Sequence, residues 1–310
     1  MPALSFSRRL SRLACRALGC LLLGAGAAWA QTAVSVTDTT GWNPWTKADL
    51  TRMSDITTDQ QTGQGADDFA SDATTPGFYQ KAGTIGGVDH LLFRARFDKY
   101  DGPDRWGNGG NWGIGMDVNG DGALDLIMMM SESSGNVNNR TRTITWGDPG
   151  TGANTGPSTT SWTFPTQTPI TLTTNTTYDG MLATDSNLNA NPDLLLSFAV
   201  SFANLQAAVR AYTPFTAFTM TYSTRLSYIA FTSTQANALN QDLFGTTGNT
   251  SSALTWAELG AITGPSDAFG VVPEPATYAQ VAALLLAGGF VAWRRRASRR
   301  AVTSDGVRAE

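Results

Sequence analysis

The chain has 310 residues, with 21 Lys and Arg against 25 Asp and Glu, one His and two Cys. Each end carries a charge of +4, over residues 1–30 and 294–310, whereas residues 31–293 hold 11 basic and 23 acidic side chains and a charge of −12. An acidic central region without clustered Lys and Arg excludes binding to the phosphate backbone of nucleic acid.

The first thirty residues have the pattern of a secretory signal peptide. Arg side chains between positions 8 and 16 precede an apolar run from Ala17 to Ala28, and Ala28-Trp29-Ala30 is a small-x-small cleavage pattern before Gln31. The run is shorter than the roughly 20 residues that span a bilayer, so a transmembrane helix is the weaker interpretation. A lipoprotein anchor at Cys20 fits less well, because the residues before it make a poor lipobox. We predict that signal peptidase removes residues 1–30 and, with them, both Cys.

Residues 31–271 are predicted to form a β-rich extracytoplasmic domain. The region is rich in Thr, Gly and Asn, a composition that favours strands and turns. Short apolar or alternating runs bounded by turn residues favour an antiparallel β-sandwich or jelly-roll-like body. The strands are expected at 91–97, 112–118, 126–130, 142–146, 170–173, 178–183, 194–202, 218–222 and 226–231. Two connecting helices are expected at 202–212 and 234–243.

The run from Leu91 to Phe97 has the clearest alternation. Phe93, Ala95 and Phe97 are predicted to face the core, with Arg94 and Arg96 facing solvent. Further along, residues 151–169 are rich in Thr, Gly, Ser and Pro, which suits either a linker between two domains or a long loop on one sandwich. Two aromatic side chains in this segment favour the loop.

A Gly-containing turn, Asp-Val-Asn-Gly-Asp-Gly-Ala-Leu-Asp at 117–125, carries oxygen side chains at positions 1, 3, 5 and 9. Ca²⁺ prefers about six to eight oxygen ligands arranged around such a turn. The EF-hand Glu at position 12 is replaced by Met128, so the loop resembles the Asp-rich turns of secreted β-proteins. We predict structural Ca²⁺ bound by Asp117, Asn119, Asp121 and Asp125, with further ligands sought among Asp98, Asp101 and Asp104. A metal-free hairpin turn is the alternative.

A second segment, at 185–193, repeats part of this pattern. It lacks the central Gly, and Asn replaces two Asp, so any ion would be held more weakly. The candidate ligands of this weaker site are Asp185, Asn187, Asn189 and Asp193. The alternative is that both segments are strand-entry turns of related geometry.

The C-terminal region combines three features in order: Val272-Pro273-Glu274-Pro275, an uncharged stretch at 276–293, and the Arg294-Arg295-Arg296 cluster. Eighteen helical residues span about 27 Å, close to the hydrocarbon thickness of a bilayer, and the Arg cluster would stay in the cytoplasm with the tail 297–310. Residues 272–296 resemble the PEP-CTERM sorting signal of Gram-negative surface proteins. The resemblance implies cleavage near the motif by an exosortase in the inner membrane and delivery to the cell surface or extracellular matrix of a bacterium that makes exopolysaccharide or biofilm. The alternative is a plain C-terminal anchor.

Three classes of function remain open for the body. Nucleophilic catalysis and zinc are disfavoured, since the mature body has one His, His90, and no Cys. A glycoside-active enzyme needs only two carboxylates, but nothing marks a pair. A carbohydrate-binding protein would use flat aromatic side chains, for which Trp106 and Trp112 are the candidate platform. We expect no enzymatic activity, and we predict a structural or exopolysaccharide-associated protein.

Overall fold

The computed structural model describes residues 32–45, 68–72, 74–98, 110–133, 140–149, 166–183, 188, 192–233 and 242–244. The predicted signal peptide, the sorting motif at 272–275 and the Arg cluster at 294–296 lie outside these ranges. Within them, no helix has both the length and the apolar character needed to cross a membrane. The predicted membrane segment, 276–293, is not among the described residues.

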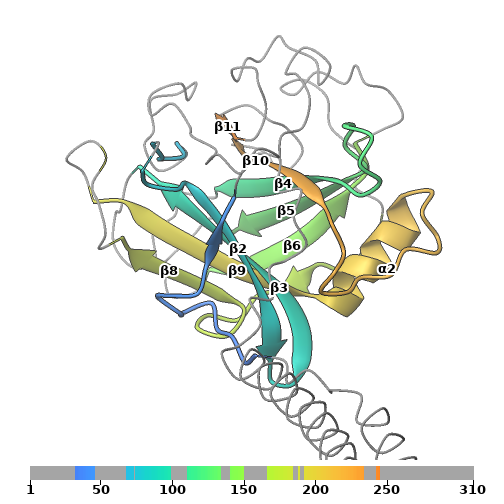
Figure 1. Ribbon diagram of the computed structural model, residues 1–310, viewed down its shortest axis with the longest axis horizontal. Helices are drawn as coiled ribbons and strands as arrows, with labels where there is room; N and C mark the ends of the chain where they lie inside the picture. The colour runs from blue at the N-terminus through green and yellow to red at the C-terminus, as the bar shows by residue number, and fades with distance from the viewer. Residues whose placement is uncertain are drawn as a thin grey trace, which may run out of the picture.

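The described residues form two antiparallel sheets that pack face to face (Figure 1). The five-stranded sheet has the order β1-β2-β3-β9-β8, and the six-stranded sheet has the order β11-β10-β4-β5-β6-β7. The strands are β1 (Asn43–Pro44), β2 (Phe78–Ile85), β3 (Val88–Phe97), β4 (Asn111–Asp117), β5 (Leu126–Glu132), β6 (Arg142–Gly147), β7 (Ile170–Thr171), β8 (Tyr178–Leu182), β9 (Leu194–Ser201), β10 (Ser227–Ser233) and β11 (Asp242–Phe244). The predicted mainly β class with two antiparallel sheets is therefore confirmed.

The chain moves between the sheets three times. Strands β4 to β7 form a meander, β8 returns to the first sheet, and the helix α2 (Phe202–Tyr212) carries the chain from β9 back to β10. Strand β6, before the segment 151–169, and strand β8, after it, belong to one sandwich. Ser201 caps α2 by accepting a hydrogen bond from the backbone N–H of Asn204.

The core between the sheets is aromatic. Trp112 of β4 contacts three phenylalanines of the other sheet, with ring centroids 5.7 Å from Phe78, 6.0 Å from Phe97 and 4.7 Å from Phe198. Tyr228 of β10 packs edge-on against Phe93 at 5.5 Å. Rings of this size bury large apolar areas, so these contacts join the two sheets.

One expected strand is wrong, and so is the end of one expected helix. Residues 218–222, predicted as a strand, are irregular and belong to no strand, because α2 binds their backbone: Arg210 donates to the carbonyl of Phe218, and Gln206 accepts from the N–H of Met220. At the end of the predicted helix 234–243, Leu243 lies in β11 and pairs with Phe231. Residues 234–241 are outside the described ranges. The helix predicted at 202–212 is confirmed as α2.

The prediction that Arg94 and Arg96 face solvent is wrong. They do point away from the core between the sheets, but Arg94 is 3% exposed and Arg96 is fully buried. Further layers cover this outer face, which alternation along a single strand does not reveal. Residues 32–45 lie over Arg94, and Asp193 forms an ion pair with Arg96.

Along the edge of β6 where β7 pairs, a side chain forms backbone hydrogen bonds that a longer strand would otherwise make. Gln167 accepts a hydrogen bond from the N–H of Trp146 at 2.8 Å and donates one to the carbonyl of the same residue at 2.6 Å. Strand β7 itself pairs only with Thr143 and Ile144.

Candidate functional sites

The loop between β4 and β5 is organised by the carboxylate of Asp117. One of its oxygens accepts the N–H groups of Asn119 and Gly120, at 3.2 and 2.6 Å, and the other accepts the N–H of Gly122 at 2.9 Å. Gly120 and Gly122 have φ of +81° and +85°, in the left-handed region that glycine adopts without steric cost. Asp117 therefore holds the turn in shape, and its position at the end of a buried strand makes it 3% exposed.

The remaining predicted ligands line the same loop. Asn119 donates to Asp121 at 2.9 Å and accepts the N–H of Asp121 at 2.7 Å. Asp125 accepts the N–H of Val118 at 2.7 Å. Burial raises the pKa of the Asp125 carboxyl, and the charges of Asp117 and Asp121 raise it further. The loop thus gathers three carboxylates whose mutual repulsion a cation would relieve.

Of the further carboxylates considered, the structure describes only Asp98, which does not reach this loop. Phe97 packs against Trp112, near the start of β4, whereas Asp117 ends the same strand, so Asp98 lies towards the opposite end of the sandwich. Asp98 was proposed as a further ligand, and that assignment is wrong; Asp101 and Asp104 are outside the described residues. Throughout the described ranges, no three His, Cys, Asp or Glu side chains form a group judged able to hold a metal ion.

Of the predicted second site, the structure describes Asp193 alone; Asp185, Asn187 and Asn189 lie outside the described ranges. Asp193 is fully buried, and its carboxylate accepts a hydrogen bond from Arg96 at 3.0 Å. It precedes Leu194, the partner of Phe97, and so lies near Asp98 rather than near the β4–β5 loop. The described role of Asp193 is therefore to neutralise a buried guanidinium.

The candidate ligand platform Trp112 and the acidic side chain Glu132 are also buried. Trp112 has no exposed surface and cannot offer a ring face to a sugar, so its assignment to a ligand platform is wrong; Trp106 is outside the described residues. The Glu132 carboxylate is buried between Arg140 and Arg142, which bond one oxygen each. The Arg142 guanidinium also lies 4.1 Å from the ring centroid of Tyr178, in the other sheet, so this ion pair braces the two layers.

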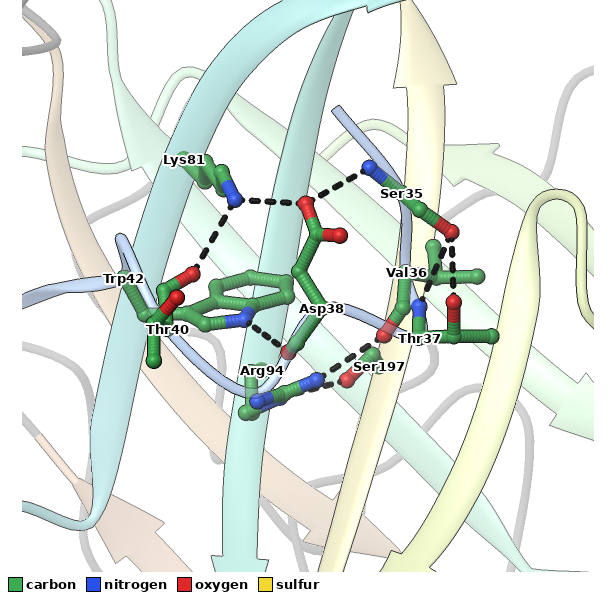
Figure 2. Close-up of polar contacts among 9 residues, drawn as sticks. All are labelled: Ser35, Val36, Thr37, Asp38, Thr40, Trp42, Lys81, Arg94 and Ser197. Atoms are coloured by element: carbon green, nitrogen blue, oxygen red, sulfur yellow. Dashed lines mark hydrogen bonds and ion pairs between the residues drawn. The ribbon is translucent and has the colours of Figure 1, made fainter. Parts of the chain in front are cut away.

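A polar cluster that the sequence did not indicate lies on the outer face of the five-stranded sheet (Figure 2). Arg94 is at its centre: it donates to the carbonyl of Val36 at 2.8 Å and to the hydroxyl of Ser197 at 2.7 Å, and its guanidinium lies 4.0 Å from the ring centroid of Trp42. Trp42 in turn donates to the carbonyl of Asp38 at 2.7 Å. We call residues 32–45 the N-terminal strap.

The strap is held to β2 at three places. Near its start, Val34 and Thr32 exchange backbone hydrogen bonds with Thr84, and near its end β1 pairs with β2. Between them, the Asp38 carboxylate accepts hydrogen bonds from Lys81 at 2.6 Å and from the N–H of Ser35 at 2.9 Å. Partial burial raises the pKa of Asp38, but these bonds outweigh it and hold that pKa below its usual value. The sequence held one signal of this contact between the strap and β2: Gly83, which has no side chain and so leaves room for Val34 and Thr32.

The candidate sorting residues are Val272, Pro273, Glu274 and Pro275, and the candidate topology residues are Arg294, Arg295 and Arg296; all lie outside the described residues. Comparison with known protein families, with curated proteins and with solved structures found no match for this chain.

Proposed function

We propose that this chain is an exported protein of the cell surface or extracellular matrix, with a structural or exopolysaccharide-associated role and no catalytic activity. The observation that carries this proposal is that Trp112 and Asp193, which the sequence marks as a candidate ligand platform and a candidate metal ligand, are buried. There they pack or form ion pairs that support the fold. We also propose that the sandwich is of the jelly-roll-like kind.

Export and sorting rest on the two ends of the sequence. Signal peptidase would remove residues 1–30, and an exosortase in the inner membrane would cut near Pro273-Glu274-Pro275. The intact mass of protein recovered from the surface of an exosortase-containing Gram-negative host tests both cuts. We expect a chain that begins at Gln31 and ends near Pro275; a mature chain that retains 276–310 would contradict sorting.

Calcium is proposed as a structural ion at the β4–β5 loop. Asp117, Asn119, Asp121 and Asp125 supply oxygens, and a carboxylate oxygen that accepts one N–H still has a lone pair for a cation. Thermal unfolding should therefore shift upward in millimolar Ca²⁺ relative to chelator. Asp125→Asn should abolish the shift, whereas Asp72→Asn, a substitution in an exposed turn, should retain it. Identical unfolding curves for the unsubstituted protein in Ca²⁺ and in chelator would contradict the proposal of a structural calcium ion.

A carbohydrate-binding protein is the second candidate, and a glycoside-active enzyme is the third. A glycan array and a hydrolysis screen on the host's own exopolysaccharide distinguish them. Retention without hydrolysis would support association with the polysaccharide, and release of reducing ends would establish an enzyme. If the protein neither binds nor hydrolyses the polysaccharide, the structural role is supported.

A further inference from the structure

Strand β8 is the last strand at one end of the five-stranded sheet (Figure 1). Among the described residues, no strand pairs with the edge of β8 that faces away from β9. Leu182, at the end of β8, is 43% exposed, and Gly180 and Met181 are partly exposed. Solvent therefore reaches this edge of the sheet.

The hydrogen bonds between β8 and β9 show which backbone groups point to this edge. Ala183 donates to the carbonyl of Asp193, and Ala199 donates to the carbonyl of Thr177, so the odd-numbered residues of β8 are the ones that bond β9. In an antiparallel pair, the residues between them direct their N–H and C=O groups to the opposite side. These residues are Tyr178, Gly180 and Leu182.

Tyr178 uses its backbone groups within its own turn. Its N–H bonds the carbonyl of Thr173, and its carbonyl accepts the N–H of Asn175. For the outward N–H and C=O groups of Gly180 and Leu182, no partner lies among the described residues. An edge of this kind can bond one further strand, and Gly180 and Leu182 are the residues of β8 that would bond it.

We propose that the edge of β8 pairs antiparallel with β8 of a second copy of this chain, about a two-fold axis at Met181. In this register, Gly180 of each copy lies opposite Leu182 of the other, and each such pair exchanges two hydrogen bonds. The outward groups of both residues are then bonded, and the interface is the same on both copies, as two-fold symmetry requires. A register centred on Gly180 would instead place Leu182 opposite Tyr178, whose groups are already bonded.

The side chains of β8 suit a second β8 as the partner. Leu182 and Gly180 share one face of the sheet by alternation, so the exposed Leu182 of each copy lies over Gly180 of the other, where no side chain fills the space. On the opposite face, Met181 meets Met181 of the other copy, an apolar and adaptable pair. Asp179 lies opposite Ala183, so no two carboxylates face each other across the pair.

The pair is expected to be weak. Strand β8 has 5 residues, and stable interfaces bury roughly 1,200–2,000 Å², more than two short strands supply. A covalent trap is therefore the suitable measurement. The inference is independent of the function proposed above, because it rests on the backbone and side chains of β8 alone.

Disulfide trapping tests both the pair and its register. In the full-length chain with Cys15→Ser and Cys20→Ser, Met181→Cys should form an inter-chain disulfide under mild oxidation, because opposite residues at such a position have Cα atoms about 4.5 Å apart. On a non-reducing gel, this dimer should form at least about tenfold faster than that of Val88→Cys, which is 51% exposed and measures random collision. Asp179→Cys, on the same face of β8, should also be slow, since the two copies of residue 179 lie about 13 Å apart in this register.

Two substitutions should abolish the trapped dimer. Gly180→Pro removes an N–H that points away from β9, a position where a sheet edge tolerates proline. Leu182→Lys places a charge on the edge at an exposed site, so it keeps the test available if proline disturbs the strand. With either substitution, the dimer of Met181→Cys should form no faster than that of Val88→Cys.

Three results would overturn the proposal. One is a dimer of Met181→Cys that forms at the rate of Val88→Cys or is unaffected by both substitutions at the edge. Another is a dimer of Asp179→Cys that forms as fast as that of Met181→Cys. The third is a disulfide between Met181→Cys and a different protein in place of the second copy.

Discussion

The two outer faces of the sandwich are both buried, but by different chemistry. On the five-stranded sheet, Arg94 and Arg96 form hydrogen bonds and ion pairs with the segments that cover them. On the six-stranded sheet, the face is aliphatic and aromatic, with Gly113 under the ring of Phe231. The residues of a covered face thus indicate its cover: charged groups need partners with fixed geometry, whereas apolar groups need only a complementary surface.

The largest effect is expected at the buried ion pair of the five-stranded sheet. Arg96→Met leaves the fully buried Asp193 carboxylate without its guanidinium and should lower the free energy of unfolding by about 3–5 kcal/mol. The double variant Arg96→Met with Asp193→Leu should recover most of this loss. Urea unfolding measures both, and a double variant as unstable as the single one would contradict this account.

Gly113→Ala and Gly83→Ala compare the two faces with one matched substitution. A Cβ at Gly113 would lie 2.0 Å from the ring of Phe231, and one at Gly83 would lie 2.5 Å from the carbonyl oxygen of Thr32. Gly113→Ala should destabilise the whole domain by about 1–3 kcal/mol. Gly83→Ala should chiefly release the start of the strap, seen as faster amide exchange at residues 32–36. Global destabilisation by Gly83→Ala alone would reverse the comparison.

Arg94→Lys tests whether the strap depends on geometry or only on charge. Lysine keeps the charge but loses the planar group that bonds Val36 and Ser197 and stacks on Trp42. We expect a loss of about 1–2 kcal/mol and faster proteolysis within the strap. Arg225→Lys, at an exposed position before β10, is the control. Equal effects of the two substitutions would mean that charge alone suffices.

The smallest effect is expected at Asp38. Asp38→Asn removes its ion pair with Lys81 and should cost less than about 1 kcal/mol near neutral pH, since the pair is partly exposed. Because the folded-state pKa of Asp38 is lowered, its contribution is present above the usual value of 3.8 and is lost as the pH falls through the lowered value. Unfolding curves against pH should therefore converge in acid. A constant difference at all pH values would exclude the ionised carboxylate as the cause.

Much of the sandwich follows from local patterns. Strands such as β3 and the helix α2 were predicted because their apolar periodicity and flanking turns are complete within the segment itself. Strand β2 was missed because Gln80 faces inward and Lys81 outward among few large apolar residues. The burial of Arg94 was missed because its partner Val36 is far away in sequence.

The candidate site was predictable only as a loop. The spacing at 117–125 marks the turn correctly, because each side chain bonds the backbone of its own loop. Whether a residue from another part of the chain can be a ligand depends on which end of its strand lies near the loop. Asp98 follows β3 in the chain, but the packing of Phe97 on Trp112 places Asp98 towards the start of β4, whereas the loop follows the end of β4.

The bonds between Gln167 and Trp146 protect part of the edge of the six-stranded sheet. The unpaired N–H and C=O groups of an edge strand invite a strand from a neighbouring molecule. Beyond the short β7, the amide of Gln167 occupies both groups of Trp146 and acts as a one-residue substitute for a strand. At the cell surface, where we propose that the protein lies, this side chain would hinder edge-to-edge pairing of neighbouring copies at Trp146.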